Sequence, residues 1–156
     1  FYGTVYSTKY ALEHILSRKG SIIGISSIAG HKGLPARSAY SASKFAMAGF
    51  LESIRIENLK KDLHVLIASP GFTASKIREN AINSHGQTQN SSPRDENKMM
   101  TAEEVAEKIV IATIKRKNKL VLTFQGKLLV FLNKFIPTVV DKLVFKSLSK
   151  EKNSPF

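Results

Sequence analysis

Two residues four positions apart, Tyr40 and Lys44, have side chains suited to proton transfer. They lie near the start of residues 38–61, an alanine-rich stretch whose apolar spacing predicts a long helix. Residues four apart on a helix project from the same face, so the Lys44 ammonium is expected beside the Tyr40 ring. A nearby positive charge and the positive potential at the start of a helix both favour the phenolate. Tyr40 could therefore exchange a proton near neutral pH.

Ser27 adds a third polar group, at the end of the apolar run 21–27. This run predicts a strand that is covered on both faces. Open α/β sheets bind their ligands at the carboxyl ends of such strands, where a hydroxyl can hydrogen-bond to a carbonyl oxygen. Taken alone, these three residues are a weak signal, because a tyrosine and a lysine on a helix surface have the same spacing.

Strand and helix patterns alternate along the chain, which predicts crossover connections and a parallel sheet. The helix patterns cover residues 2–18, 38–61 and 101–117, and the strand patterns cover 21–27, 64–69 and 119–124. Thr101 and Glu104 have the spacing of a capping box. Residues 83–98 are polar and predict an irregular loop. With only three strands, we predict an α/β fold that is the C-terminal half of a doubly wound, three-layer Rossmann domain.

Composition excludes several classes of protein. The 156 residues contain no cysteine, which excludes disulfides and thiolate metal sites. The four histidines are scattered without carboxylates at ligand spacing, so we predict no metal site. The chain opens without Met and without a charged leader before an apolar run, so we expect a start inside a longer chain and no signal peptide.

The C-terminal end carries most of the net charge of +12. Residues 115–152 contain ten basic and two acidic residues. Between them, apolar residues interrupted by Pro137 predict a pair of helices. One interpretation is packing on the domain or on a second subunit; the other is a basic amphipathic surface that docks at a membrane. We predict no nucleic-acid partner, because base-stacking aromatic clusters are missing, and a cytoplasmic protein or one peripheral to a membrane.

The segment Ile25 to Lys44, ISSIAGHKGLPARSAYSASK, closely resembles the active-site segment of short-chain dehydrogenases/reductases. In that family a catalytic serine lies thirteen positions before the tyrosine, which indicates Ser27 rather than Ser26. The tripeptide at 69–71, Ser-Pro-Gly, resembles the family's turn beside the nicotinamide. The resemblance runs from residue 1 to about 124 and looks nearest to steroid and lipid-ketone reductases, such as 11β-hydroxysteroid-dehydrogenase-like members.

The resemblance implies a role for each matching residue. Tyr40 would be the general acid in reduction and the base in oxidation. Lys44 would promote ionisation of Tyr40 and hydrogen-bond to the nicotinamide ribose, and Ser27 would orient the carbonyl. The residues implied in cofactor binding are Tyr40, Lys44, Pro70, Gly71, Phe72, Thr73 and Ser75.

The implied protein is an NAD(P)-dependent oxidoreductase that transfers a hydride between the cofactor and an alcohol or carbonyl, with a hydrophobic substrate. The residues that distinguish NAD from NADP are not in this sequence; we favour NADP slightly. The helix at 38–61 resembles the family's subunit interface, which implies a homodimer or homotetramer. The alternative is a catalytically silent relative that acts as a binding or scaffold subunit.

Two departures from the family pattern concern the cofactor. The glycine-rich turn that holds the pyrophosphate is absent, as is the Asn-Ala-Gly strand end. Phe1-Tyr2-Gly3 resembles the tail of a motif whose asparagine, the fourth catalytic residue, would precede Phe1. We therefore expect the N-terminal nucleotide-binding half to be missing. Residues 1–124 would be the second half of the domain, and residues 125–156 a basic amphipathic helical extension.

Overall fold

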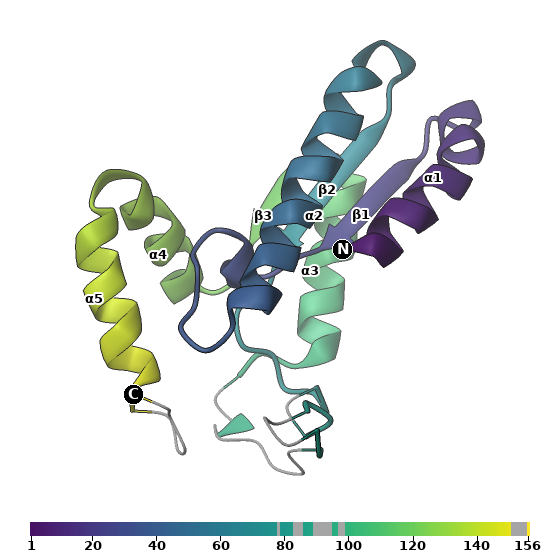
Figure 1. Ribbon diagram of the computed structural model, residues 1–156. Coiled ribbons are helices and arrows are strands. Elements are labelled where there is room, and N and C mark those ends of the chain that lie inside the picture. The colour runs from purple at the N-terminus through teal and green to yellow at the C-terminus, as the bar shows by residue number, and fades with distance from the viewer. Residues whose placement is uncertain (78, 83–85, 89–94, 97–98, 151–155) are drawn as a thin grey trace.

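The computed structural model contains one parallel sheet and five α-helices in the part of the chain that it describes (Figure 1). The described residues are 1–77, 79–82, 86–88, 95–96, 99–150 and 156. Much of the predicted loop 83–98 lies outside them. The strands are β1 (Ser21–Ile25), β2 (His64–Ser69) and β3 (Lys119–Val121), and they lie in the order β1-β2-β3. The predictions of an α/β fold and a parallel sheet are confirmed.

The central strand β2 is buried along its whole length, because it pairs with a strand on each edge and helices pack against both of its faces. Strand β1 differs from the prediction. It ends at Ile25 instead of Ser27, and that side chain is 46% exposed. Among the described residues β1 pairs only with β2, so β1 is an edge strand, and its residues are less buried than those of β2.

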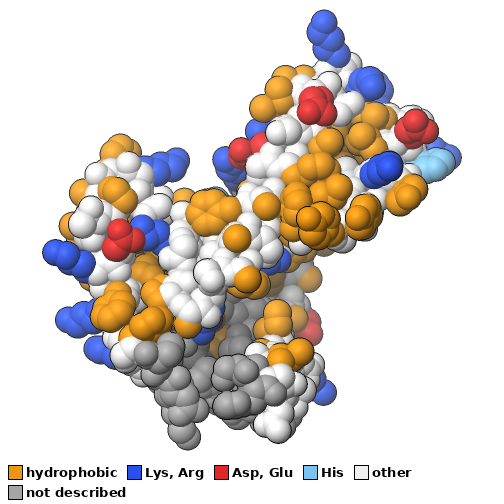
Figure 2. Space-filling view, in the orientation of Figure 1, with side chains coloured by type: hydrophobic (Ala, Val, Ile, Leu, Met, Phe, Trp, Pro, Cys, Tyr) orange, Lys and Arg blue, Asp and Glu red, His pale blue; other side chains and the backbone are white. Residues whose placement is uncertain are grey.

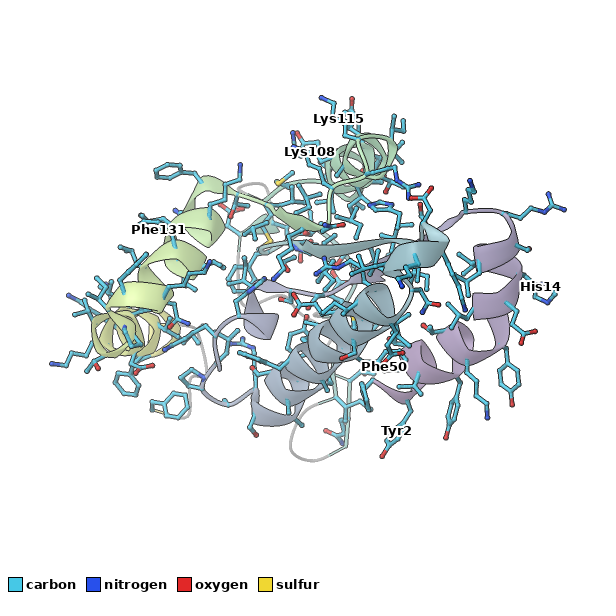
Figure 3. All side chains as sticks on the ribbon, turned by 90° about the horizontal axis from the view of Figure 1, so that it is seen from above. Tyr2, His14, Phe50, Lys108, Lys115 and Phe131 are labelled. Carbon is cyan, nitrogen blue, oxygen red and sulfur yellow. The ribbon has the colours of Figure 1, made fainter. Side chains whose placement is uncertain are left out.

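Helices cover both faces of the sheet, which gives three layers. Helices α1 (Tyr2–Ser17) and α2 (Ser38–Glu57) lie on one side, and α3 (Ala102–Ile114) lies on the other (Figure 3). Between α1, α2 and the sheet lies an apolar core that has Leu51, Leu63, Val65 and Ile67 at its centre. This packing fixes the start of α2, and therefore Tyr40 and Lys44, against the carboxyl edge of β1 and β2.

Local hydrogen bonds and backbone conformation determine where the helices begin and end. The capping box at α3 is present, with Thr101 Oγ1 accepting from the Glu104 amide and the Glu104 carboxylate accepting from the Thr101 amide. Helix α2 ends at Glu57, earlier than predicted, and the Asn58 side chain donates to the Ile54 carbonyl. Just after α1, Lys19 adopts the left-handed conformation (φ 48°).

The C-terminal residues form a helical hairpin, α4 (Phe124–Phe135) and α5 (Pro137–Leu148), beside the sheet (Figure 1). The prediction of a third strand to residue 124 is therefore too long, because Thr123 (φ 64°) turns the chain and caps α4 by accepting from the Gly126 amide. The two helices pack through Leu129, Leu132, Val140, Val144 and Leu148, together with Leu34. No helix in the described part of the chain is long and apolar enough to cross a membrane.

Candidate active site

The first two turns of α2 bring Tyr40 and Lys44 together, as the spacing predicts. Lys44 Nζ lies 5.7 Å from the centroid of the Tyr40 ring. The same ammonium donates to the Ile25 carbonyl, at the end of β1, over 2.8 Å. The Tyr40 side chain is 40% exposed and can meet a ligand from solvent. The structure thus contains a phenol with a positioned cation at the carboxyl edge of the sheet.

The environment of Lys44 is partly desolvated. Burial lowers the pKa of Lys44 from its ordinary value, because the charged form loses hydration. The contact with Ile25 compensates part of this loss, since a carbonyl oxygen accepts one of the three ammonium hydrogens. The remaining hydrogens are available for a ligand beside Tyr40. A charge in this setting is screened less than one on an open surface.

Ser26 and Ser27 lie in different environments. Ser26 is only 5% exposed, and its hydroxyl donates to the Lys44 carbonyl over 3.4 Å. Ser27 is half-buried, and its Oγ accepts from the Ala29 amide, which caps the short 3₁₀ helix Ile28–Gly30. Among the described residues nothing accepts the Ser27 hydroxyl hydrogen, so it is available for a substrate oxygen. This agrees with Ser27 as the functional serine and Ser26 as its structural neighbour; the roles themselves stay predictions.

The predicted cofactor turn follows β2 and lies against the segment that follows β1. The Ile28 amide donates to the Pro70 carbonyl over 3.2 Å, which joins the two strand ends. Thr73 Oγ1 donates to the Gly71 carbonyl, while Phe72 and Ser75 are exposed. A Cβ on Gly71 would lie 3.2 Å from the side chain of Thr123, so the turn also packs against the residue that begins the hairpin.

His31 connects the two segments of the site. Its Nε2 is 2.9 Å from Ser69 Oγ, and Ser69 is 1% exposed. Its carbonyl accepts from the Asn133 side chain of α4 over 3.1 Å. Burial lowers the pKa of His31, and Lys119 and Lys134 act in the same direction. No local pattern reveals these contacts, because the partners are 38 and 102 residues away.

Fold and site together define a Rossmann-type α/β protein with a serine, a tyrosine and a lysine at the carboxyl edge of its sheet. The sequence profile of the short chain dehydrogenase family matches residues 1–85. The chain belongs to this family, and it is a relative of the family's oxidoreductases.

Curated relatives extend the match over nearly the whole chain. The dehydrogenase/reductase SDR family member 7B of Rattus norvegicus is 32% identical over 156 residues, which cover 99% of this chain and 48% of that protein. The SDR family protein 7-like of Anopheles gambiae is 41% identical over 87 residues, 55% of this chain and 27% of that one. The chain spans about half the length of the curated relatives it matches. A particular likeness to 11β-hydroxysteroid dehydrogenases stays a prediction.

Solved structures show the same fold. A short chain dehydrogenase from Burkholderia cenocepacia in complex with NADP has a TM-score of 0.72 and 18% identity, covering 92% of this chain and 55% of that one. ElxO with NADP bound has a TM-score of 0.57 and 26% identity over 76% of this chain and 51% of its own. 4-Hydroxyisoleucine dehydrogenase, complexed with NADH, has a TM-score of 0.59 and 20% identity over 78% and 53%. Whether a nucleotide-binding half precedes residue 1 is not tested by these matches and stays a prediction.

Proposed function

We propose that this chain supplies the proton-transfer side of an NAD(P)-dependent oxidoreductase that interconverts an alcohol and a carbonyl. The observation that carries the proposal is the position of the Lys44 ammonium, 5.7 Å from the Tyr40 ring centroid at the carboxyl edge of the sheet. When bound, the nicotinamide would supply the hydride. The residues of this chain would supply the proton, the orientation and the electrostatic field.

The groups present fit one end of such a cofactor. Lys44 has ammonium hydrogens left over after its bond to Ile25, and these can donate to a pair of ribose hydroxyls. Phe72 is exposed directly after Pro70 and Gly71, which gives an apolar wall for a flat ring. The glycine-rich turn that would hold the pyrophosphate is not in this sequence. We therefore place the pyrophosphate site outside these 156 residues.

The proposed proton path involves three side chains. In reduction, the Tyr40 hydroxyl donates its proton to the oxygen that becomes an alkoxide, and the resulting phenolate is stabilised by the Lys44 ammonium. In oxidation, the phenolate accepts the proton of the alcohol. The Ser27 hydroxyl donates a hydrogen bond to the same substrate oxygen and fixes its position. General acid–base catalysis of this kind contributes about 10²–10⁴-fold to the rate.

Further parts of the proposal concern cofactor, substrate and subunits. NADP as the cofactor is supported by ElxO, which is 26% identical and has NADP bound. A hydrophobic substrate is supported by the exposed Phe72 of the predicted cofactor turn and by the exposed Ile77 that follows this turn in the chain. A homodimer or homotetramer is supported by the exposed tyrosines along α1 and by hydrophobic side chains gathered over α1 and α2 (Figure 2).

The experiment compares the full-length protein with its Tyr40→Phe variant, using NADPH and NADH with a panel of hydrophobic ketones. Tyr40→Phe should lower turnover about 10²–10⁴-fold, because only the hydroxyl is removed. Cofactor binding, measured by quenching of protein fluorescence, should persist. Tyr10→Phe, at an exposed tyrosine of α1, is the matched control and should keep full turnover. Unchanged turnover in Tyr40→Phe contradicts the proposal, and a wild type that binds cofactor without turning over any ketone supports the silent relative.

A further inference from the structure

The α4–α5 hairpin exposes an apolar stripe on α4 that no described residue covers. Four large side chains on α4 recur at spacings of four, three and four residues, so they lie on one side of the helix. These residues are Phe124, Leu128, Phe131 and Phe135. Phe124 and Phe135 are 79% and 68% exposed, and the rings of Phe131 and Phe135 are 5.1 Å apart. Figure 3 shows Phe131 on the outer side of α4.

The second helix continues the stripe on the same side of the hairpin. On α4, Asn133 and Gly126 face the body of the domain, through contacts with His31 and Ile28. The stripe lies about half a turn of helix away from these two residues, and therefore points away from the body. On α5, Asp141 faces the body through its ion pair with Lys32.

Val140 and Val144 of α5 pack against α4. Because Val140 and Val144 face α4, the helical spacing places Val139 and Leu143 on the same side of the hairpin as the stripe of α4. Both side chains are exposed. We call the six residues together the hairpin face: Phe124, Leu128, Phe131, Phe135, Val139 and Leu143.

Lysines border the hairpin face on both flanks. Lys127 and Lys134 lie along one side of the α4 stripe, and Lys142 and Lys146 lie along the outer side of α5. All four are exposed, and within the described residues none pairs with a carboxylate. Figure 2 shows lysine and hydrophobic side chains side by side over the hairpin. An apolar centre with a cationic border is the pattern of a helix that lies in the plane of a lipid–water interface.

Charge favours a lipid surface over a second copy of the chain as the partner of the hairpin face. In a two-fold symmetric dimer the same face meets itself, so the lysines of both copies would come together. The one acidic residue of the hairpin, Asp141, is already paired with Lys32. The repulsion would therefore be left without compensation. An anionic lipid surface complements the same lysines and offers apolar chains to the aromatic rings.

We propose that the hairpin face is a docking surface for an anionic membrane. The phenylalanines enter the boundary between headgroups and acyl chains, and the lysines contact the lipid phosphates and carboxylates. Because Asn133 and Thr123 connect the hairpin with His31 and Gly71, docking would hold the candidate active site close to the lipid surface. The proposal does not depend on the oxidoreductase activity.

The test is flotation of the full chain with two kinds of vesicle, phosphatidylcholine alone and phosphatidylcholine with an equal amount of phosphatidylserine. We expect binding to the second kind that weakens as salt is added. The double variant Phe131→Ser/Phe135→Ser should abolish it. Lys142→Glu/Lys146→Glu should weaken it by at least about fivefold per lysine. Lys108→Glu/Lys115→Glu makes the same charge change on α3 and at the residue directly after it, far from the hairpin in Figure 3, and should weaken binding much less.

The altered residues are all exposed, so we expect every variant to fold. Circular dichroism and melting curves check this. Three results would overturn the proposal: no binding by the wild type, full binding by both hairpin variants, or an equal loss in the α3 control. A fourth result would instead identify a second copy of the chain as the partner of the hairpin face. If Phe131→Ser/Phe135→Ser converts a dimer to a monomer on size exclusion while flotation is unchanged, the hairpin face is a contact between copies of the chain.

Discussion

His31 and Ser69 are joined by a hydrogen bond of 2.9 Å between Nε2 and Oγ, although 38 residues separate them in the chain. The bond ties the loop after Ser27 to the last residue of β2, directly before Pro70 and Gly71. It thus connects the segment with the proposed substrate-binding hydroxyl to the proposed nicotinamide turn. His31 touches neither ligand in this scheme, and its role is to position both segments.

Removing the Ser69 hydroxyl should reveal this bond as a loss of stability. Ser69→Ala leaves the His31 ring nitrogen without its partner, at a cost of about 1–3 kcal/mol in the free energy of unfolding. Urea denaturation followed by circular dichroism measures this quantity. Ser53→Ala is the matched control, because that hydroxyl donates to the Gly49 carbonyl on an exposed helix surface. The control should change stability by less than about 0.5 kcal/mol. Equal effects in the two variants would contradict the positioning role.

Acidification should destabilise the wild type through His31. Burial lowers the folded-state pKa of His31 below the ordinary value of 6.5, and Lys119 and Lys134 act in the same direction. Below pH 6.5 the unfolded chain therefore takes up the proton first, so the free energy of unfolding falls as pH decreases towards the folded-state pKa. Glu52 opposes the effect without reversing it. His31→Gln should lack this part of the pH dependence, as measured by urea titrations between neutral and mildly acidic pH. Parallel pH profiles for the two proteins would refute the assignment.

The two adjacent serines should separate activity from stability. Ser27→Ala removes a hydrogen-bond donor from the substrate oxygen and should lower turnover about 10²–10³-fold. Ser26→Ala affects a buried hydroxyl that points at the Lys44 carbonyl, so most of the turnover should remain while stability falls by about 1 kcal/mol. Steady-state kinetics and urea denaturation of both variants give the comparison. If Ser26→Ala is the variant that loses turnover, the assignment of Ser27 is wrong.

Gly30 should tolerate no side chain, whereas Gly33 in the same loop should accept one. A Cβ on Gly30 would lie 2.6 Å from Ser26 Oγ and 3.2 Å from the Lys44 carbonyl oxygen, and the backbone of α2 cannot easily move. Gly30→Ala should therefore cost about 1–3 kcal/mol of stability. Gly33 has nothing within 4 Å of the same position, so Gly33→Ala should be close to neutral. Thermal unfolding distinguishes the two variants. Similar melting temperatures would contradict the prediction and show that the backbone of α2 moves to accommodate the added Cβ.

The elements and the proximity of Tyr40 and Lys44 could be predicted because both depend on local spacing. The apolar stripe of α2 and the unbroken apolar run of β2 indicate which residues are buried. A spacing of four residues on a helix places the two side chains next to each other in any surroundings. The sequence distinguishes Ser27 from Ser26 as the functional serine only through the family resemblance. The physical reason for the difference is the close contact of Ser26 with Gly30 and Lys44.

The remaining features depend on partners that are distant in the chain. His64 looked like one of four scattered histidines, yet it is buried in β2 and its ring nitrogens contact Ser21 Oγ and the Lys117 carbonyl. Neither contact leaves a pattern in the surrounding sequence. The left-handed residues Lys19 and Thr123 were also unpredictable, because neither is glycine or asparagine and tertiary packing selects their conformation.

The bond from Asn133 to the carbonyl of His31 spans 102 residues, and it has a consequence for the order of assembly. During synthesis the strands β1 and β2 leave the ribosome well before α4 does. Until residue 133 emerges, the loop around His31 lacks the contact that completes its backbone hydrogen bonding. The site at the sheet edge is thus completed by a segment that is translated after β1 and β2, and a ribosome stalled before α4 would hold a chain whose His31 loop still lacks this contact.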